Sequence, residues 1–137
     1  MVSREDLESF LIRMGLEYEE VDPGMFLTGG EDGPPVVVHH AENLLLIRMK
    51  VMDMPDENER SLELYRTLLE LNANEVVHGA YGIEDGDLII SDTLELETLD
   101  FHELQASMES ISLAAATHME QIRDLAGAGA AVGESEG

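Results

Sequence analysis

Hydrophobic and polar positions repeat with two different periods along the chain, and the changes of period outline its helices and strands. The first stretch is helical, because apolar residues recur at helical spacing between positions 7 and 14. Ser3 can cap this helix together with Asp6. Gly15 supplies the left-handed residue that ends it. The pattern then changes to short apolar runs typical of strands, at residues 25–28, 36–41 and 44–52.

The run at 44–52 predicts a strand with two different faces, because successive side chains of a strand point to opposite sides. One face is entirely apolar. The other carries Leu44, Leu46, Arg48 and Lys50, so it is half apolar and half basic. Two interpretations of the basic pair are open. Arg48 and Lys50 bridge acids of their own subunit, or they line a groove in which a partner strand or helix is held.

A second helix is expected after Pro55, where Asp56 and Glu59 have the spacing of a capping box, and it ends near residues 72–74. Its apolar arc is wider than one contact requires, and is made of Leu62, Leu64, Tyr65, Leu68, Leu69 and Leu71. Apolar surface in excess of what one small subunit buries favours an interface between subunits. We expect the partner or dimer surface to consist of Leu44, Leu46, Arg48, Lys50, Leu64, Leu68 and Leu71.

Another hairpin is predicted from residues 76–83 and 87–96, joined by a turn at Asp85 and Gly86. Asp-Gly between two β-rich runs is a strong hairpin signal. Gly79 and Gly82 indicate a bulge or a close backbone contact in the first of these strands.

The last predicted element is a long helix that Asp100 and Glu103 can cap. Steps of three and four residues give it an apolar seam, made of Phe101, Leu104, Met108, Ile111, Ala115, His118, Ile122 and Leu125. The Gly/Ala/Glu-rich segment 127–137 has no periodicity and little to bury, so we expect a disordered tail.

The order of these elements is α-β-β-β-α-β-β-α. Strands joined by hairpins form an antiparallel sheet, which helices must cover to complete a core. The sequence therefore predicts a single α+β domain over residues 1–126, with an antiparallel β-sheet flanked by helices.

Charge excludes several classes of partner. The chain has 137 residues, with 7 Lys and Arg against 30 Asp and Glu, for a formal net charge of −23. So negative a surface repels phosphate backbones and anionic lipids, and we expect no nucleic acid and no membrane as partners. Cysteine is absent, and no leader or membrane-spanning run is visible, so a cytoplasmic location is expected.

Candidate chemistry is sparse. Asp92 falls on the apolar side of its strand, where a carboxylate needs a hydrogen bond or a place at the sheet edge. His39 and His40 point to opposite faces and cannot share a metal ion, while His118 in the helical seam fits a hydrogen-bonded interface residue better than a ligand. We expect no catalytic residues, no metal and no cofactor. A small enzyme or metal-binding protein that uses a non-local carboxylate or histidine cluster is the alternative.

Methionine is abundant, with 8 residues against 6 aromatic ones. Its flexible, polarizable side chain suits surfaces that accommodate varied apolar partners, and it equally fills irregular cores. Any single methionine fits a place in the core better than a place at a binding surface, and two function classes stay open, a protein-binding module and an enzyme.

One segment resembles a known family. The residues that carry the resemblance are Leu71-Asn72-Ala73, the Gly79–Ile83 strand, the Asp85-Gly86-Asp87 turn, Leu88-Ile89-Ile90, Thr93-Leu94-Glu95-Leu96 and Leu99. They resemble the YbjN-like family, which is related in fold to the class I type III secretion chaperones of the Tir-chaperone or CesT-like group. The resemblance implies a secretion-chaperone-like fold, a homodimer without catalytic activity, and a chaperone-like role in holding a segment of another protein.

Overall fold

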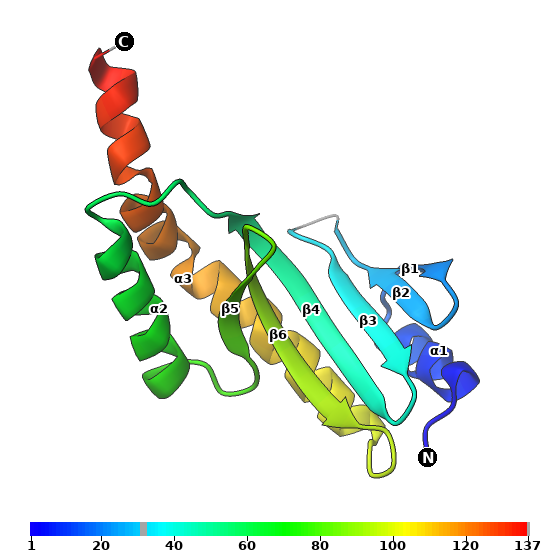
Figure 1. Cartoon of the computed structure of the whole chain (residues 1–137). Helices are drawn as coiled ribbons and strands as arrows, with labels where there is room; N and C mark the ends of the chain where they lie inside the picture. Colours follow the sequence, from blue (N-terminus) through cyan, green and yellow to red (C-terminus); the bar gives the residue numbers. More distant parts are fainter. Residues whose placement is uncertain (31–32, 137) are drawn as a thin grey trace.

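The described residues form three helices and six strands (Figure 1). The computed structural model describes residues 1–30 and 33–136, and for 128–136 it describes the backbone alone. The elements are α1 (Arg4–Arg13), β1 (Tyr18–Asp22), β2 (Met25–Thr28), β3 (Val36–Ala41), β4 (Leu44–Asp53), α2 (Ser61–Asn74), β5 (Ala80–Glu84), β6 (Asp87–Glu95) and α3 (Phe101–Glu136).

The strands form one antiparallel sheet in the order β1-β2-β3-β4-β6-β5. Every neighbouring pair except β4 and β6 is joined by a short connection, while α2 and β5 intervene between those two strands. The long strand β4 lies at the centre, where Leu46 pairs with His39 of β3 and with Thr93 of β6. The predicted α+β class and antiparallel sheet are confirmed.

The helices leave one face of the sheet uncovered. In Figure 1, α3 runs behind the sheet and α1 lies behind its opposite end, while α2 stands beside β5 and packs against α3. The core fills the space between the sheet and these helices, and its largest fully buried side chains include Phe26, Leu45, Ile47, Ile90, Leu104 and Ile111. The face of the sheet toward the viewer therefore meets no helix in the described residues.

Several local predictions are confirmed by hydrogen bonds. Ser3 and Asp6 form a reciprocal capping box at the start of α1. The backbone N–H of Glu103 donates to the Asp100 carboxylate at 2.7 Å, which caps α3. In the turn between β5 and β6, Asp85 and Gly86 both have positive φ, as a two-residue hairpin turn of this type requires.

The structure corrects three of the predicted elements. An additional strand, β1, precedes β2, so the sheet has one strand more than the predicted order. The expected capping box at Asp56 and Glu59 is wrong, because α2 begins at Ser61 and its first residues lack a side-chain cap. Residues 56–58 have no regular structure and residues 59–60 form a turn, where the Arg60 N–H donates to the Asn58 side chain.

The strand expected from residue 76 begins only at Ala80. Gly79 explains the boundary, since its φ of +89° is open to glycine, and a β-carbon there would lie 2.6 Å from the Ser91 carbonyl oxygen. The predicted close backbone contact is confirmed at Gly79, whereas a β-carbon on Gly82 would meet only an ordinary contact with Ile89.

The outer edge of β5 is partly occupied by a side chain. The Asn72 amide accepts a hydrogen bond from the Tyr81 N–H at 2.7 Å and donates one to the Tyr81 carbonyl oxygen at 3.2 Å. A side-chain amide thus takes both positions that the backbone of a further strand would use.

The predicted tail covers residues 127–137. The side chains of residues 128–136 and the whole of residue 137 lie outside the described part of the chain. The backbone of α3 is described up to Glu136. Disorder of this segment stays a prediction.

Candidate functional site

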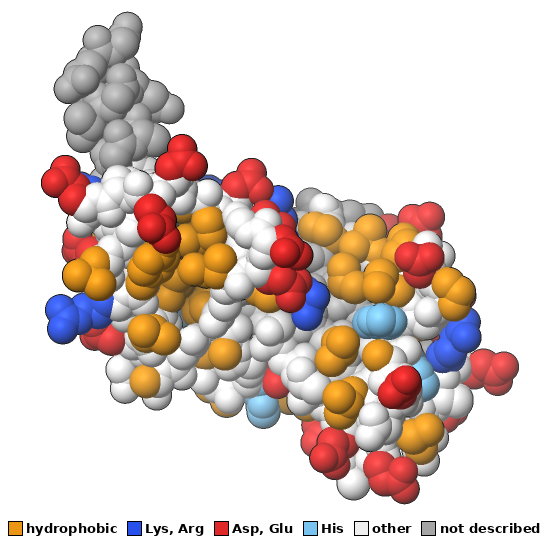
Figure 2. Space-filling model, viewed as in Figure 1, with side chains coloured by type: hydrophobic (Ala, Val, Ile, Leu, Met, Phe, Trp, Pro, Cys, Tyr) orange, Lys and Arg blue, Asp and Glu red, His pale blue; other side chains and the backbone are white. Residues whose placement is uncertain are grey.

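The uncovered side of the sheet is rich in partly buried apolar side chains. We call it the outer sheet face, and define it by Met25, Leu27, Val37, His39, Leu44 and Leu46. The register places Met25, His39 and Leu46 in one row, and Leu27 and Val37 in the next. Figure 2 shows an apolar area over the β1–β4 side of this face, with acidic side chains around it.

The two basic residues of this face are engaged within the subunit. The Arg48 guanidinium lies 2.8 Å from the Glu84 carboxylate, and the Lys50 ammonium lies 2.6 Å from Asp53 and 3.3 Å from Asp87. The hydrogen bond to Asp53, followed by the one to Asp87, raises the pKa of Lys50. The contact with Lys50 lowers the pKa of Asp53. Of the two interpretations of this pair, the structure shows bridging to acids of the same subunit.

Helix α2 has two apolar stripes, and the sequence-based choice between them was wrong. Leu64, Leu68 and Leu71 were expected at a surface, but they are buried in the core of the subunit, where α2 packs against α3. The other stripe is outside: Leu62 is 77% exposed and Leu69 is 69% exposed. A shallow hollow follows this exposed side of the helix, lined by Leu62, Tyr65, Arg66, Leu69, Glu70, Ala73 and Asn74.

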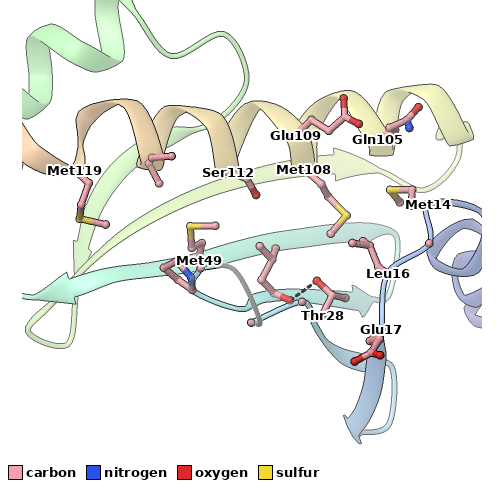
Figure 3. Close-up of a pocket in the computed structure, with 18 residues that line it drawn as sticks. Met14, Leu16, Glu17, Thr28, Met49, Gln105, Met108, Glu109, Ser112 and Met119 are labelled. Carbon is pink, nitrogen blue, oxygen red and sulfur yellow. Dashed lines mark hydrogen bonds between the residues drawn. The ribbon is translucent and has the colours of Figure 1, made fainter.

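On the helix side of the sheet, a half-open cavity of about 710 Å³ lies between α3, the end of α1 and the connection from β2 to β3 (Figure 3). We call it the methionine cavity, because four side chains of this type line it: Met14, Met49, Met108 and Met119. In Figure 3, Met108 points from α3 toward the sheet, and Met14 and Leu16 close one end. The Thr28 hydroxyl at the floor donates to the Val36 carbonyl oxygen at 2.9 Å, so its hydrogen is already used.

Comparisons with known proteins show the family of the chain and the solved structures that share its fold. The CesT_Tir_1 family model matches residues 2–128. The chain belongs to the CesT_Tir_1 family. No curated protein matches the sequence at a significant level.

Three solved structures illustrate the CesT_Tir_1 fold. A chain of the heterodimeric ExoU–SpcU complex from the type III secretion system of Pseudomonas aeruginosa is 15% identical, with 88% of this chain and 97% of that chain covered and a TM-score of 0.66. YbjN from E. coli is 16% identical, with 87% and 92% covered and a TM-score of 0.64. An uncharacterised protein from Methanothermobacter thermautotrophicus is 13% identical, with 90% and 99% covered and a TM-score of 0.68. The fold is type III secretion chaperone-like, and the resemblance to YbjN and these chaperones is confirmed.

The polar groups in the core of this CesT_Tir_1 member are satisfied. Ser107 donates to the Asp92 carboxylate at 2.7 Å, which supplies the hydrogen bond that an acid on this face was expected to need. The buried His118 lies 2.9 Å through Nδ1 from the Tyr81 hydroxyl, which donates to the Ala114 carbonyl oxygen. Because the Tyr81 hydroxyl has one hydrogen and donates it to Ala114, it accepts from His118, whose Nδ1 must then carry a hydrogen.

The other histidines also lie apart from any metal-binding arrangement. The His40 ring lies 2.8 Å from the Val2 carbonyl oxygen on the inner side, whereas His39 belongs to the outer sheet face. Across the described residues, no three histidine or acidic side chains gather in a way that would hold a metal ion. No described helix is both long and apolar enough to cross a membrane.

The sequence signalled the exposed stripe of α2 and the methionine cavity only indirectly. The wide apolar arc of the second helix contains both stripes, and periodicity alone does not tell which stripe meets the core. The abundance of methionine indicated an adaptable surface. The four methionines of the cavity come from three segments, namely the end of α1, β4 and α3, so their convergence depends on tertiary structure.

Proposed function

We propose that the protein is a non-catalytic, homodimeric, chaperone-like module that holds a segment of a partner protein. The observation that carries this proposal is the outer sheet face, an apolar surface that no helix covers in the described residues. A contiguous apolar patch that stays partly accessible on a small protein is typical of an interaction site. The non-catalytic part rests on the likeness to secretion chaperones.

The exposed stripe of α2 is the proposed dimer surface. Leu62, Tyr65 and Leu69 recur at steps of three and four residues, the spacing with which one helix packs along another. Figure 2 shows a second apolar area over α2, separate from the one over β1–β4. A two-fold axis that pairs this stripe with its own copy leaves the outer sheet face free for a partner.

Acidic charge around these surfaces favours a basic partner. The net charge of −23 attracts such a partner at long range and speeds encounter, whereas apolar burial supplies most of the affinity. We therefore expect the association rate to fall with salt, while the dissociation rate changes little.

Affinity capture from the native cell tests the proposal with two matched variants. Leu46→Asp places a charge on the outer sheet face. Leu113→Asp makes the same change at a position on α3 that is 69% exposed and outside this face. We expect the wild type and Leu113→Asp to retain the same partner, and Leu46→Asp to lose it while its circular dichroism spectrum is unchanged.

Two further measurements test the proposed homodimer and the expectation that the protein holds no metal. Sedimentation equilibrium at tens of micromolar should give twice the chain mass, and a monomer mass would contradict the dimer. Elemental analysis of the purified protein should show no stoichiometric metal, because zinc, iron or manganese at one per chain would favour an enzyme or metal-binding protein.

A further inference from the structure

His39 is the polar member of the outer sheet face, and it lies in the interior of that face. Its side chain is partly buried, and its register partners are Met25 on β2 and Leu46 on β4. The next positions on the same side of β2, β3 and β4 complete a ring around it, and they are Leu27, Val37, Ala41, Leu44 and Arg48. The imidazole is therefore surrounded by apolar side chains, with Arg48 as the exception.

This ring holds no carboxylate that could compensate a charge on His39. Arg48 is paired at 2.8 Å with Glu84 of β5, which lies on the far side of β6 from β3. The acidic residues nearest along the strands lie outside the ring, and they are Glu19 and Asp22 of β1, Glu42 in the turn after β3, and Glu95 of β6. They are two strands or three residues away, which corresponds to about 10 Å and exceeds the screening length of about 8 Å at physiological ionic strength.

The ring nitrogens of His39 also differ from those of the histidines on the inner side of the sheet. His40 lies 2.8 Å from the Val2 carbonyl oxygen, and His118 lies 2.9 Å from the Tyr81 hydroxyl. In the part of the chain that the structure describes, the His39 imidazole has no hydrogen bond to another protein group. Water is then the hydrogen-bond partner of its nitrogens, and a molecule that covers the outer sheet face removes that water.

Protonation changes the cost of covering His39. Histidine ordinarily changes its charge near pH 6.5. A neutral imidazole that is covered by apolar groups loses hydrogen bonds to water, whereas an imidazolium also loses the hydration of its charge, which costs far more. The net charge of −23 favours basic partners, and such a partner adds repulsion between like charges. Covering this face therefore favours the neutral form of His39, and a charged His39 releases its proton to water when a partner binds.

We propose that His39 makes the outer sheet face a pH-sensitive binding surface, which holds a basic and apolar partner segment near pH 7.5 and releases it near pH 5.5. This inference rests on the proposed function, because it assumes that the partner covers this face, and it adds the regulation of that face. Below about pH 6.5 the free protein binds more protons than the complex does, so the affinity falls as the pH falls through that value.

The probe is a peptide of alternating lysine and valine, because such a peptide presents one apolar and one basic side when it is extended. Lysine keeps its charge between pH 5.5 and pH 7.5, whereas an ordinary histidine goes from about nine-tenths charged to about one-tenth charged. We expect isothermal titration calorimetry to give a dissociation constant about tenfold higher at pH 5.5 than at pH 7.5. At pH 6.5, titrations in two buffers of different ionisation heat should show about half a proton released per complex.

A matched pair of histidine variants tests the position. His39→Gln replaces the imidazole by a polar group that is neutral at both pH values. His78→Gln makes the same change at an exposed residue in the connection between α2 and β5. We expect His78→Gln to retain the full pH dependence of the wild type, and His39→Gln to bind the peptide with nearly equal affinity at both pH values. His39→Leu also removes the titrating group, so its binding should be equally independent of pH, with circular dichroism as the check on folding of each variant.

The outcomes separate this inference from the proposed function. An equal loss of affinity at pH 5.5 in the wild type, His39→Gln and His78→Gln would overturn the role of His39, and so would a wild-type affinity that does not change with pH. In both cases, loss of peptide binding in Leu46→Asp would still support the outer sheet face as the binding site. Absence of peptide binding to the wild type at both pH values would count against the proposed function and this inference together.

Discussion

At the residue scale, the core accommodates polar side chains by pairing each one. Asp92 accepts from the buried Ser107, and Tyr81 connects His118 to the backbone of α3. A buried polar group without a partner costs about 1–3 kcal/mol. The described part of the chain has no buried side-chain nitrogen or oxygen atom without a partner. These pairs align β5 and β6 with α3.

Tyr81 predicts a specific loss of stability at alkaline pH. Burial raises the pKa of Tyr81 to about 12, from an ordinary value near 10. The folded state holds the phenolic proton more tightly than the unfolded chain, so this contribution is complete below about pH 10 and is lost as the pH rises to about 12. We expect Tyr81 to ionise last among the three tyrosines, together with loss of structure.

Phenolate absorbance and circular dichroism, followed together through an alkaline titration, test this expectation. Tyr81→Phe should remove the late phenolate step and should lower the free energy of unfolding at neutral pH by about 1–3 kcal/mol, since His118 loses its partner. Ionisation of all three tyrosines near pH 10 with the fold intact would contradict the role of burial.

At the element scale, α2 joins two surfaces of different character. One stripe completes the core, and the other is exposed along the same helix. Adjacent leucines therefore have opposite environments: Leu68 is 6% exposed, whereas Leu69 is 69% exposed. A helix with apolar residues on both sides is expected where one side packs within the subunit and the other against a second copy.

The two leucines give a matched test of the dimer. Leu68→Asp should unfold the protein, because truncating a buried leucine already costs about 2–5 kcal/mol and a charge adds to that. Leu69→Asp should leave the circular dichroism spectrum unchanged and shift sedimentation equilibrium from dimer to monomer. A Leu69→Asp protein that remains dimeric would place the interface elsewhere.

Local signals in the sequence predicted most elements, because caps, turns and periodicity are encoded in neighbouring residues. The hairpin β3–β4, the Asp85-Gly86 turn and the start of α3 are of this kind. Strand β1 was missed because four of its five residues are exposed, and its strand character comes from pairing with β2. The core side of α2 was misassigned because both stripes are apolar, and only the position of α3 decides between them.

At the scale of the whole molecule, the excess of acidic residues lowers the stability of the folded state. With 30 acidic and 7 basic residues, like charges repel one another more strongly in the compact state than in the unfolded chain. In the described part of the chain, Arg4, Arg48, Lys50 and Arg66 form ion pairs, and the acidic residues far outnumber the cations that could pair with them. Net repulsion therefore opposes folding at low ionic strength.

Added salt should stabilise the fold. Raising NaCl from about 0.1 M to about 1 M shortens the screening length from about 10 Å to about 3 Å, which weakens repulsion between exposed carboxylates. We expect the urea midpoint to rise over this range. A variant with Glu59→Gln, Glu97→Gln and Glu120→Gln, all at exposed positions, should respond less. A midpoint that is flat or falls with NaCl would show that repulsion is not a significant cost.

The Asn72 side chain of α2, which is hydrogen-bonded to the edge of β5, affects how copies of the chain can add to one another. A sheet with two open edges can extend without limit, since each added copy presents a new edge. Here Asn72 of α2 occupies the β5 edge at Tyr81. A strand of another copy can pair with β5 only if it first displaces this side chain, which disfavours growth of the sheet at that edge. A short polar side chain thus reduces the tendency of copies of this chain to add edge to edge.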